Sequence, residues 1–240
     1  MAGCTLGARR WGPQIGGWLT ALPVVAGPTL FFLAMEQDTA FAARAALGTL
    51  VAMIAVAAFG VVYAWVSLRY GWALSVLAGW AAFVAVTVLL LAVPWTPITA
   101  LVATLAGFTT AARVLPAERP HPAPSPTPAW DLPLRMIGTL AVVLTVTSAA
   151  DRLGPALSGA FTPFPVALTV LVVFAHAQQG APVAIQLLRG FFLAMWGFAL
   201  FCLVLAQALV PLGPGLAFAL AIAAQLAVHG VVFWRMARAG

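Results

Sequence analysis

Apolar runs long enough to cross a membrane follow one another along almost the whole chain. A crossing needs about 17–25 apolar residues, because a helix rises about 1.5 Å per residue and the hydrocarbon core is about 30 Å thick. Because the backbone must satisfy its own hydrogen bonds in lipid, we predict that these runs are helices. We place eight spans, near residues 14–34, 40–67, 72–93, 97–114, 133–150, 155–177, 181–208 and 213–234.

A proline-rich segment divides these spans into two groups. Residues 116–132 read "PAERPHPAPSPTPAWDL". The prolines forbid a regular helix and favour an extended, mobile linker. The pattern therefore predicts an all-α, polytopic transmembrane helix bundle in three parts: an N-terminal membrane half over 1–115, a cytoplasmic linker over 116–132 and a C-terminal membrane half over 133–240.

The composition supports an integral membrane protein. The 240 residues are 64% hydrophobic and 7% charged, with a mean hydropathy of +1.08. No soluble domain can hide that much apolar surface, so we expect the lipid bilayer to be the main partner. All 11 basic residues are Arg, which is typical of a GC-rich bacterial gene. They are scattered at helix ends, so the net charge of +6 does not indicate a nucleic-acid partner.

The distribution of arginines predicts an orientation in the bacterial inner membrane. Basic residues prefer cytoplasmic loops. With both termini in the cytoplasm, only Arg44 and Arg152 fall near the outer face. Arg189 lies about two turns into its helix, close enough to the cytoplasmic end to snorkel back. The remaining arginines fall inside: Arg9, Arg10, Arg69, Arg113, Arg119, Arg135, Arg235 and Arg238.

The two halves resemble each other when the sequence is shifted by 142 positions. The copies are separated by five spans, an odd number, so they have opposite orientations in the membrane. Inverted repeats of this kind are common in secondary transporters. The identities include Arg10 with Arg152, Gly12 with Gly154, Pro13 with Pro155, Thr20 with Thr162, Pro23 with Pro165 and Gln37 with Gln179.

The matched prolines mark a candidate substrate pathway. Pro and Gly interruptions at corresponding positions of inverted halves indicate a binding site near the membrane midplane. An ionisable residue within a span is also a functional candidate. The alternative is a packing kink whose freed carbonyl is satisfied by Thr, with Gly16, Gly17, Gly48 and Gly190 allowing close helix approach. The candidate pathway residues are Thr20, Pro23, Pro28, Thr162, Pro163, Pro165 and Arg189.

Two polar turns are candidate gates. In the outer turn, Arg44 could pair with Glu36 or Asp38 when the outer side closes. The inner turn, "HAQQG", contains His176 and Gln179. The alternative is an ordinary solvated loop with a snorkelling Arg.

Two further polar residues lie one turn apart in the last span. Gln225 and His229 could form an interhelical hydrogen bond or a step for a proton. Packing by an interhelical hydrogen bond is the simpler of the two interpretations.

The second half is similar to the small bacterial GlpM-like membrane proteins. The resemblance is carried by "FTPFPVALTVLVVFAHAQQG" and "LLRGFFLAMWGFALFCLVL". It covers 133–236 well and 9–93 more faintly, where Leu22-Pro23 stands for the Phe-Pro pair and no Trp follows Met53. It implies a four-helix polytopic unit and names neither a substrate nor a catalytic residue. The matching residues are Phe164, Pro165, Ala167, Leu168, Gly180, Met195 and Trp196.

The sequence contains no recognisable catalytic or cofactor motif. H-E-x-x-H, G-x-S-x-G, phosphate loops and Cys/His clusters are all missing from it, so we expect neither an enzyme nor a cofactor or metal. Two functions stay open. One is a transporter or permease for a small molecule or an ion. The other is a structural or accessory membrane protein that acts through a partner.

The first copy has no counterpart of the span at 133–150. Either the lineage lost it or the coding sequence starts upstream. The packing surface left unmatched in the first half could be covered by lipid or by a second protomer, which would make a homodimer.

The topology predicts which loops can be labelled from outside the cell. In a background without Cys4 and Cys202, Asp38→Cys should react with a membrane-impermeant thiol reagent in intact cells, and Ser125→Cys should react only after permeabilisation. Labelling of position 125 but not position 38 in intact cells would contradict the orientation.

Overall fold

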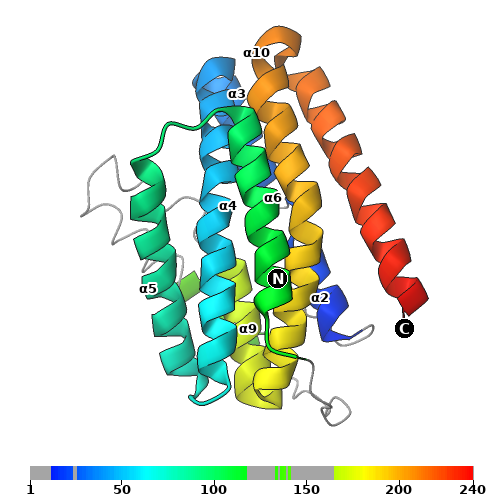
Figure 1. Ribbon diagram of the computed structural model, residues 1–240. Helices are drawn as coiled ribbons and strands as arrows, with labels where there is room; N and C mark the ends of the chain where they lie inside the picture. The colour runs from blue at the N-terminus through cyan, green and yellow to red at the C-terminus, as the bar shows by residue number, and fades with distance from the viewer. Residues whose placement is uncertain are drawn as a thin grey trace.

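The computed structural model describes residues 12–23, 26–117, 133–134, 136–138, 140–141 and 165–239. Throughout these ranges the regular structure is α-helical, which confirms the all-α class. The helices pack side by side as a bundle with roughly aligned axes (Figure 1). They are α2 (Pro13–Thr20), α3 (Ala26–Glu36), α4 (Thr39–Ser67), α5 (Trp72–Leu91), α6 (Pro97–Val114), α9 (Val166–Gln179) and α10 (Ala181–Ala239).

Four of these helices, α4, α5, α6 and α10, are long and apolar enough to cross a membrane. The predicted spans 40–67, 72–93 and 97–114 agree with α4, α5 and α6 to within two residues. Most of the predicted span 133–150, the start of 155–177 and the linker from residue 118 onward lie outside the described residues.

Local chemistry sets where several helices begin. Gly12 has a φ of 96°, a conformation that favours glycine, and Pro13 follows at the first helical position. The side chain of Asp38 accepts the backbone N–H of Phe41 and caps α4. At α6, the side chains of Thr96 and Thr99 form a reciprocal capping box.

Helix α10 folds back on itself at Gly213. This residue has φ 74° and ψ 169°, which no helix can contain, and Pro211 and Pro214 flank it. We call residues 181–212 the first arm and residues 214–239 the second arm. The two arms run in opposite directions, one rising and the other descending (Figure 1). They agree with the two spans predicted over 181–208 and 213–234.

Two helix boundaries recur at the 142-residue spacing of the predicted repeat. Helix α4 begins at Thr39, and α10 begins 142 residues later at Ala181. Gly71 precedes α5, and Gly213 stands 142 residues further on, before the second arm. The corresponding elements run in opposite directions: α4 descends where the first arm rises, and α5 rises where the second arm descends (Figure 1).

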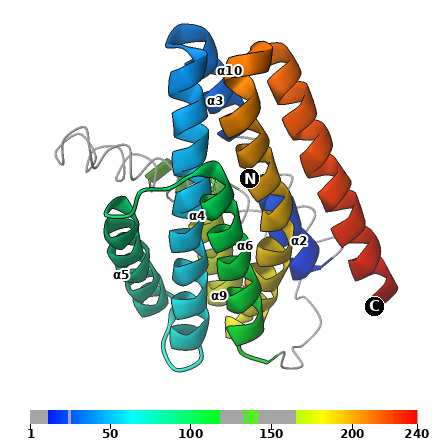
Figure 2. The same cartoon turned by 45° about the horizontal axis from the view of Figure 1, so that its top comes forward.

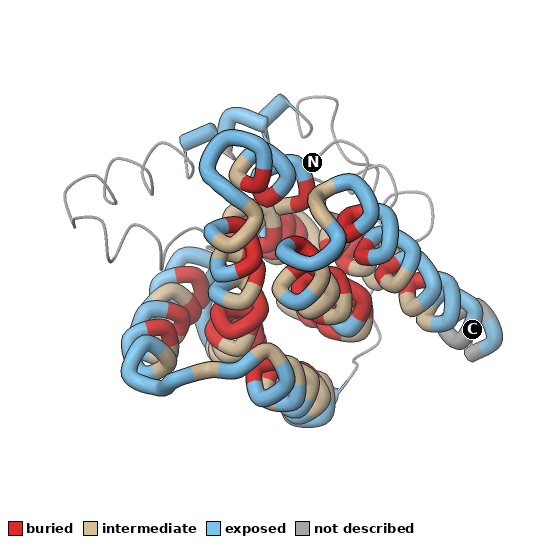
Figure 3. The backbone as a smooth tube through the Cα atoms, turned by 90° about the horizontal axis from the view of Figure 1, so that it is seen from above, coloured by how far each residue is buried: buried red, intermediate tan, exposed pale blue. Residues whose placement is uncertain are grey.

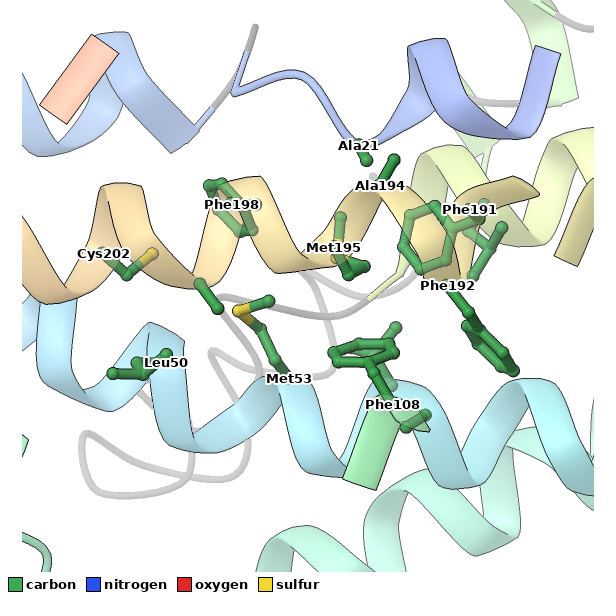
Figure 4. Packing of buried hydrophobic residues seen from close by; sticks show 14 of the residues in the cluster. Ala21, Leu50, Met53, Phe108, Phe191, Phe192, Ala194, Met195, Phe198 and Cys202 are labelled. Atoms are coloured by element: carbon green, nitrogen blue, oxygen red, sulfur yellow. The ribbon is translucent and has the colours of Figure 1, made fainter. Parts of the chain in front are cut away.

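The core lies between α4 and the first arm. Viewed along the helices, the buried residues face this centre and the exposed ones form an outer rim (Figure 3). Rings and thioethers from α4, α6 and the first arm interdigitate there, among them Met53, Phe108 and Phe192 (Figure 4). A buried hydrogen bond of 2.8 Å from Thr104 Oγ1 to the Leu50 carbonyl joins α6 to α4.

Helix α2 and the first arm are in direct backbone contact. A Cβ atom added to Gly17 would lie 1.9 Å from the Leu187 carbonyl oxygen, and one added to Gly190 would lie 1.9 Å from that of Gln14. Two glycines, one from each helix, therefore permit this crossing. The expectation that Gly48 also allows a close helix approach was wrong. Gly48 is exposed, and a Cβ added to it would meet nothing within 4 Å.

The glycine contact predicts unequal effects at two positions that correspond in the repeat. Gly190→Ala should lower the free energy of unfolding by about 3 kcal/mol or more, because a backbone must move to admit the methyl group. Gly48→Ala should leave it unchanged or raise it by up to about 1 kcal/mol, since Ala is the better helix former. Unfolding in detergent followed by circular dichroism measures both, and equal losses would contradict the contact.

Candidate functional site

The first predicted span is broken in the structure at Pro23. Helix α2 ends at Thr20. The chain tightens just after it, because the backbone N–H groups of Ala21 and Leu22 donate to carbonyls three residues earlier. Pro23 has no N–H to donate, and its ring clashes with a preceding helical turn. Its carbonyl instead accepts the N–H of Gly27 as α3 begins.

Thr20 does not reach across the break. Its hydroxyl donates to the Gly16 carbonyl at 2.8 Å, the usual bond to the preceding turn. Pro28 lies exposed in the first turn of α3, where proline costs no hydrogen bond. Of the two prolines in this span, only Pro23 therefore interrupts a helix.

A carbonyl at the break is bonded from the other end of the chain. The side-chain Nε2 of Gln225, on the second arm, donates to the Ala21 carbonyl at 3.3 Å. His229, one turn further, places Nδ1 3.2 Å from the backbone carbonyl of Gln225. Its ring lies 5.1 Å from that of Trp18 on α2, centre to centre. The interhelical hydrogen bond predicted for Gln225 is thus confirmed.

This group, Trp18, Ala21, Gln225 and His229, is the break cluster. Gln225 and His229 are only 1% and 2% exposed. Three buried atoms, Trp18 Nε1, Gln225 Oε1 and His229 Nε2, have no hydrogen-bond partner among the described residues. Each such group costs about 1–3 kcal/mol when it stays unpaired. All three belong to the contact between the end of α2 and the second arm of α10.

A second polar contact joins α4 to α9. The hydroxyl of Tyr63, which is fully buried, donates to the Val172 carbonyl at 3.3 Å and lies 3.1 Å from Nδ1 of His176. Nearby along α9, Thr169 accepts the indole N–H of Trp80 from α5 at 3.3 Å. His176, predicted as part of an inner gate, is therefore bonded to a neighbouring helix.

Arg189 lies at the end of α6. Its guanidinium donates to the Pro116 carbonyl at 2.9 Å, and the indole N–H of Trp65 donates to the Val114 carbonyl at 3.0 Å. A positive charge is favoured there, because the last carbonyls of a helix lack partners and carry partial negative charge. The structure thus gives Arg189 a role in binding the end of α6.

The outer turn contains a cap and no ion pair. Glu36 ends α3, Asp38 caps α4, and Arg44 is exposed on the second turn of α4. Within the part of the chain described, no ion pair joins Arg44 to either carboxylate. The structure therefore shows the outer gate residues without the predicted pairing.

The second proline site is only partly described. Pro165 is buried and immediately precedes α9, and Gln179 is the last residue of that helix. Thr162 and Pro163 lie outside the described residues. Helix α2, which ends before Pro23, touches α9, which begins after Pro165, as well as α10.

Sequence reasoning missed Trp18, Tyr63 and Trp65 as partners of the candidate residues. Tyr63 offered one signal, because it is one of only two tyrosines and lies in mid-span. The two tryptophans lie near span ends, where tryptophan commonly anchors a helix at the membrane interface, so their positions in the sequence do not point to a partner. Their hydrogen bonds depend on which helices become neighbours.

No family model, no curated protein and no solved structure matches the chain. The resemblance to GlpM-like proteins therefore stays a prediction. Among the described side chains, no three of the His, Cys, Asp and Glu type come together as a metal site.

The contact at the end of α6 predicts that Arg189 matters for stability. Arg189→Ala should lower the free energy of unfolding by about 1.5–3 kcal/mol, since a charged hydrogen bond is lost. Arg189→Lys keeps the charge without the planar fork and should fall between wild type and Ala. The exposed Arg44→Ala is the control and should change stability by less than about 0.5 kcal/mol. Equal effects of the two Ala variants would contradict the assignment.

Proposed function

We propose that the chain is a multi-pass protein of the bacterial inner membrane with a small-solute pathway at the interface between two inverted repeats. The large apolar side chains that α5 and α6 expose support the membrane location, among them Leu74, Leu77, Leu89, Ile98 and Val102. In water such surfaces would associate, whereas lipid tails solvate them. Both termini lie in the cytoplasm in this proposal.

The paired helix boundaries support the inverted repeat. Two elements of the first half recur 142 residues later with opposite direction: α4 as the first arm and α5 as the second (Figure 1). The helices before them, α3 and α9, form a third pair. A duplicated unit inserted in both orientations produces this relation. The same ancestry accounts for the resemblance of each half to a four-helix unit, so we retain the GlpM-like kinship as part of the proposal.

The break cluster is the observation that carries the transport proposal. Discontinuous helices at a repeat interface expose backbone carbonyls to a solute, and their irregular backbone is tolerated only inside the protein. Here the break at Pro23 faces buried polar atoms of Gln225 and His229, at a crossing of elements from the two halves. We infer that a solute passes along this crossing, with Arg189 and the two polar turns outside the binding step.

A second function is favoured by the contact between Gly17 and the first arm. Backbones that touch leave no space between the two helices. If this contact is permanent, the protein does not open along α2. In that case the chain is a structural or accessory membrane protein, and its function depends on a partner protein or on a second copy of itself.

Transport by purified protein in liposomes separates the two functions. Swelling under gradients of urea, glycerol and glycine, and quenching of an internal pH dye, report neutral solutes and protons. We expect one probe to enter faster than into empty liposomes. Pro23→Ala should change that rate by about tenfold, equivalent to about 1.4 kcal/mol on a barrier, because it restores a continuous helix.

Pro28→Ala is the matched control. This proline lies in the same predicted span and interrupts no hydrogen bond, so its removal should leave both the rate and the folded yield unchanged. Equal rates for wild type, Pro23→Ala and empty liposomes with every probe would favour the accessory function.

A further inference from the structure

The break cluster lies where α2 fits between the two arms of α10. The views from the front and after a 45° turn both place α2 beside the first arm and the second arm (Figure 2). Its glycine face contacts the first arm, and Trp18 and Ala21 contact the second. We propose that this crossing contains a binding site for one water molecule, held by Trp18, Gln225 and His229.

The hydrogen bonds around His229 fix what its ring can offer. Its Nδ1 faces the backbone carbonyl of Gln225, which can only accept, so Nδ1 carries the hydrogen. In the neutral ring, Nε2 is then a bare acceptor. Gln225 donates its amide N–H to the Ala21 carbonyl, which orients Oε1 as a second acceptor. Trp18 Nε1 is a donor and cannot accept.

Two acceptors and one donor without a partner among the described residues therefore belong to side chains that meet at one crossing of two elements. A water molecule complements them, since it can donate to Oε1 and to Nε2 and accept from the indole N–H. Buried waters typically make about three such bonds to groups that would otherwise stay unpaired. The side chains of Gln225 and His229 are almost wholly buried, so bulk solvent does not satisfy them.

The chemistry of the walls favours a neutral occupant of this size. Among the described residues, His229 contacts Trp18, Gly197 and Gln225, and Phe233 packs against Trp18; none of these four is charged. A bare ion would lose its hydration without gaining a counter-charge. The ring of His229 is held in place by the first arm, because a Cβ added to Gly197 would lie 2.4 Å from His229 Nδ1. The site is therefore suited to water, and it does not depend on transport.

Removing the indole N–H donor of Trp18 tests the site. Incorporation of β-(3-benzothienyl)alanine at position 18 replaces the indole N–H by sulfur and keeps the bicyclic ring. If water accepts from Trp18, this change should lower the thermal midpoint by about 2–4 °C. The same replacement at Trp80, whose N–H donates to Thr169, is the matched control and should cause a similar loss. An unchanged or raised midpoint at position 18, with a loss at position 80, would overturn the proposal.

A measurement on the wild-type protein is independent of any folding defect. In protein labelled with 15N-tryptophan, the Trp18 indole signal is the one missing from the spectrum of Trp18→Phe. We expect a nuclear Overhauser contact between this indole proton and a long-lived water molecule. An indole proton that shows contacts to protein hydrogens alone would mean that the N–H is paired within the chain or unpaired, and either result refutes a water site.

Discussion

The direct backbone contact between α2 and the first arm of α10 is the constraint on which the rest of the bundle depends. Only glycines at positions 17 and 190 allow the two helices to approach so closely. Once α2 is fixed there, Trp18 and Ala21 must face the second arm, and the break at Pro23 must lie beside Gln225. The contact therefore places the polar residues of the last helix at the only described interruption of the first predicted span.

Several of the few polar side chains form hydrogen bonds with backbone groups at or near helix ends. Asp38 caps the start of α4, and Trp65 binds the last carbonyl of α6. Arg189 binds the Pro116 carbonyl just beyond α6, and Gln225 binds the Ala21 carbonyl just beyond α2. Unpaired backbone groups are expensive in an apolar environment, so these residues stabilise the irregular parts of the backbone. The break cluster differs, because its side chains retain atoms that the described residues do not satisfy.

The sequence was sufficient for features that depend on neighbouring residues. Apolar run length predicted α4, α5 and α6, and Pro23 predicted the interruption of the first span. Features that depend on residues far apart in the sequence were harder to predict. Gly48 and Gly190 correspond in the predicted repeat, yet only Gly190 meets another backbone, since the identity of the neighbouring helix decides this. Glu36, Asp38 and Arg44 suggested an ion pair, but the need to cap α4 engages Asp38 instead.

The hydrogen bond from Gln225 to Ala21 has a consequence for how the chain is made. It joins residues 204 positions apart, so the Ala21 carbonyl gains this partner only after the second arm of α10 has been synthesised. Contacts between distant residues form slowly, because a long loop must close before they stabilise anything. The α10 hairpin, by contrast, closes locally around Gly213. During synthesis α2 therefore lacks this contact until the second arm of α10 has formed, and folding of the hairpin at Gly213 is the event that fixes the end of α2 in place.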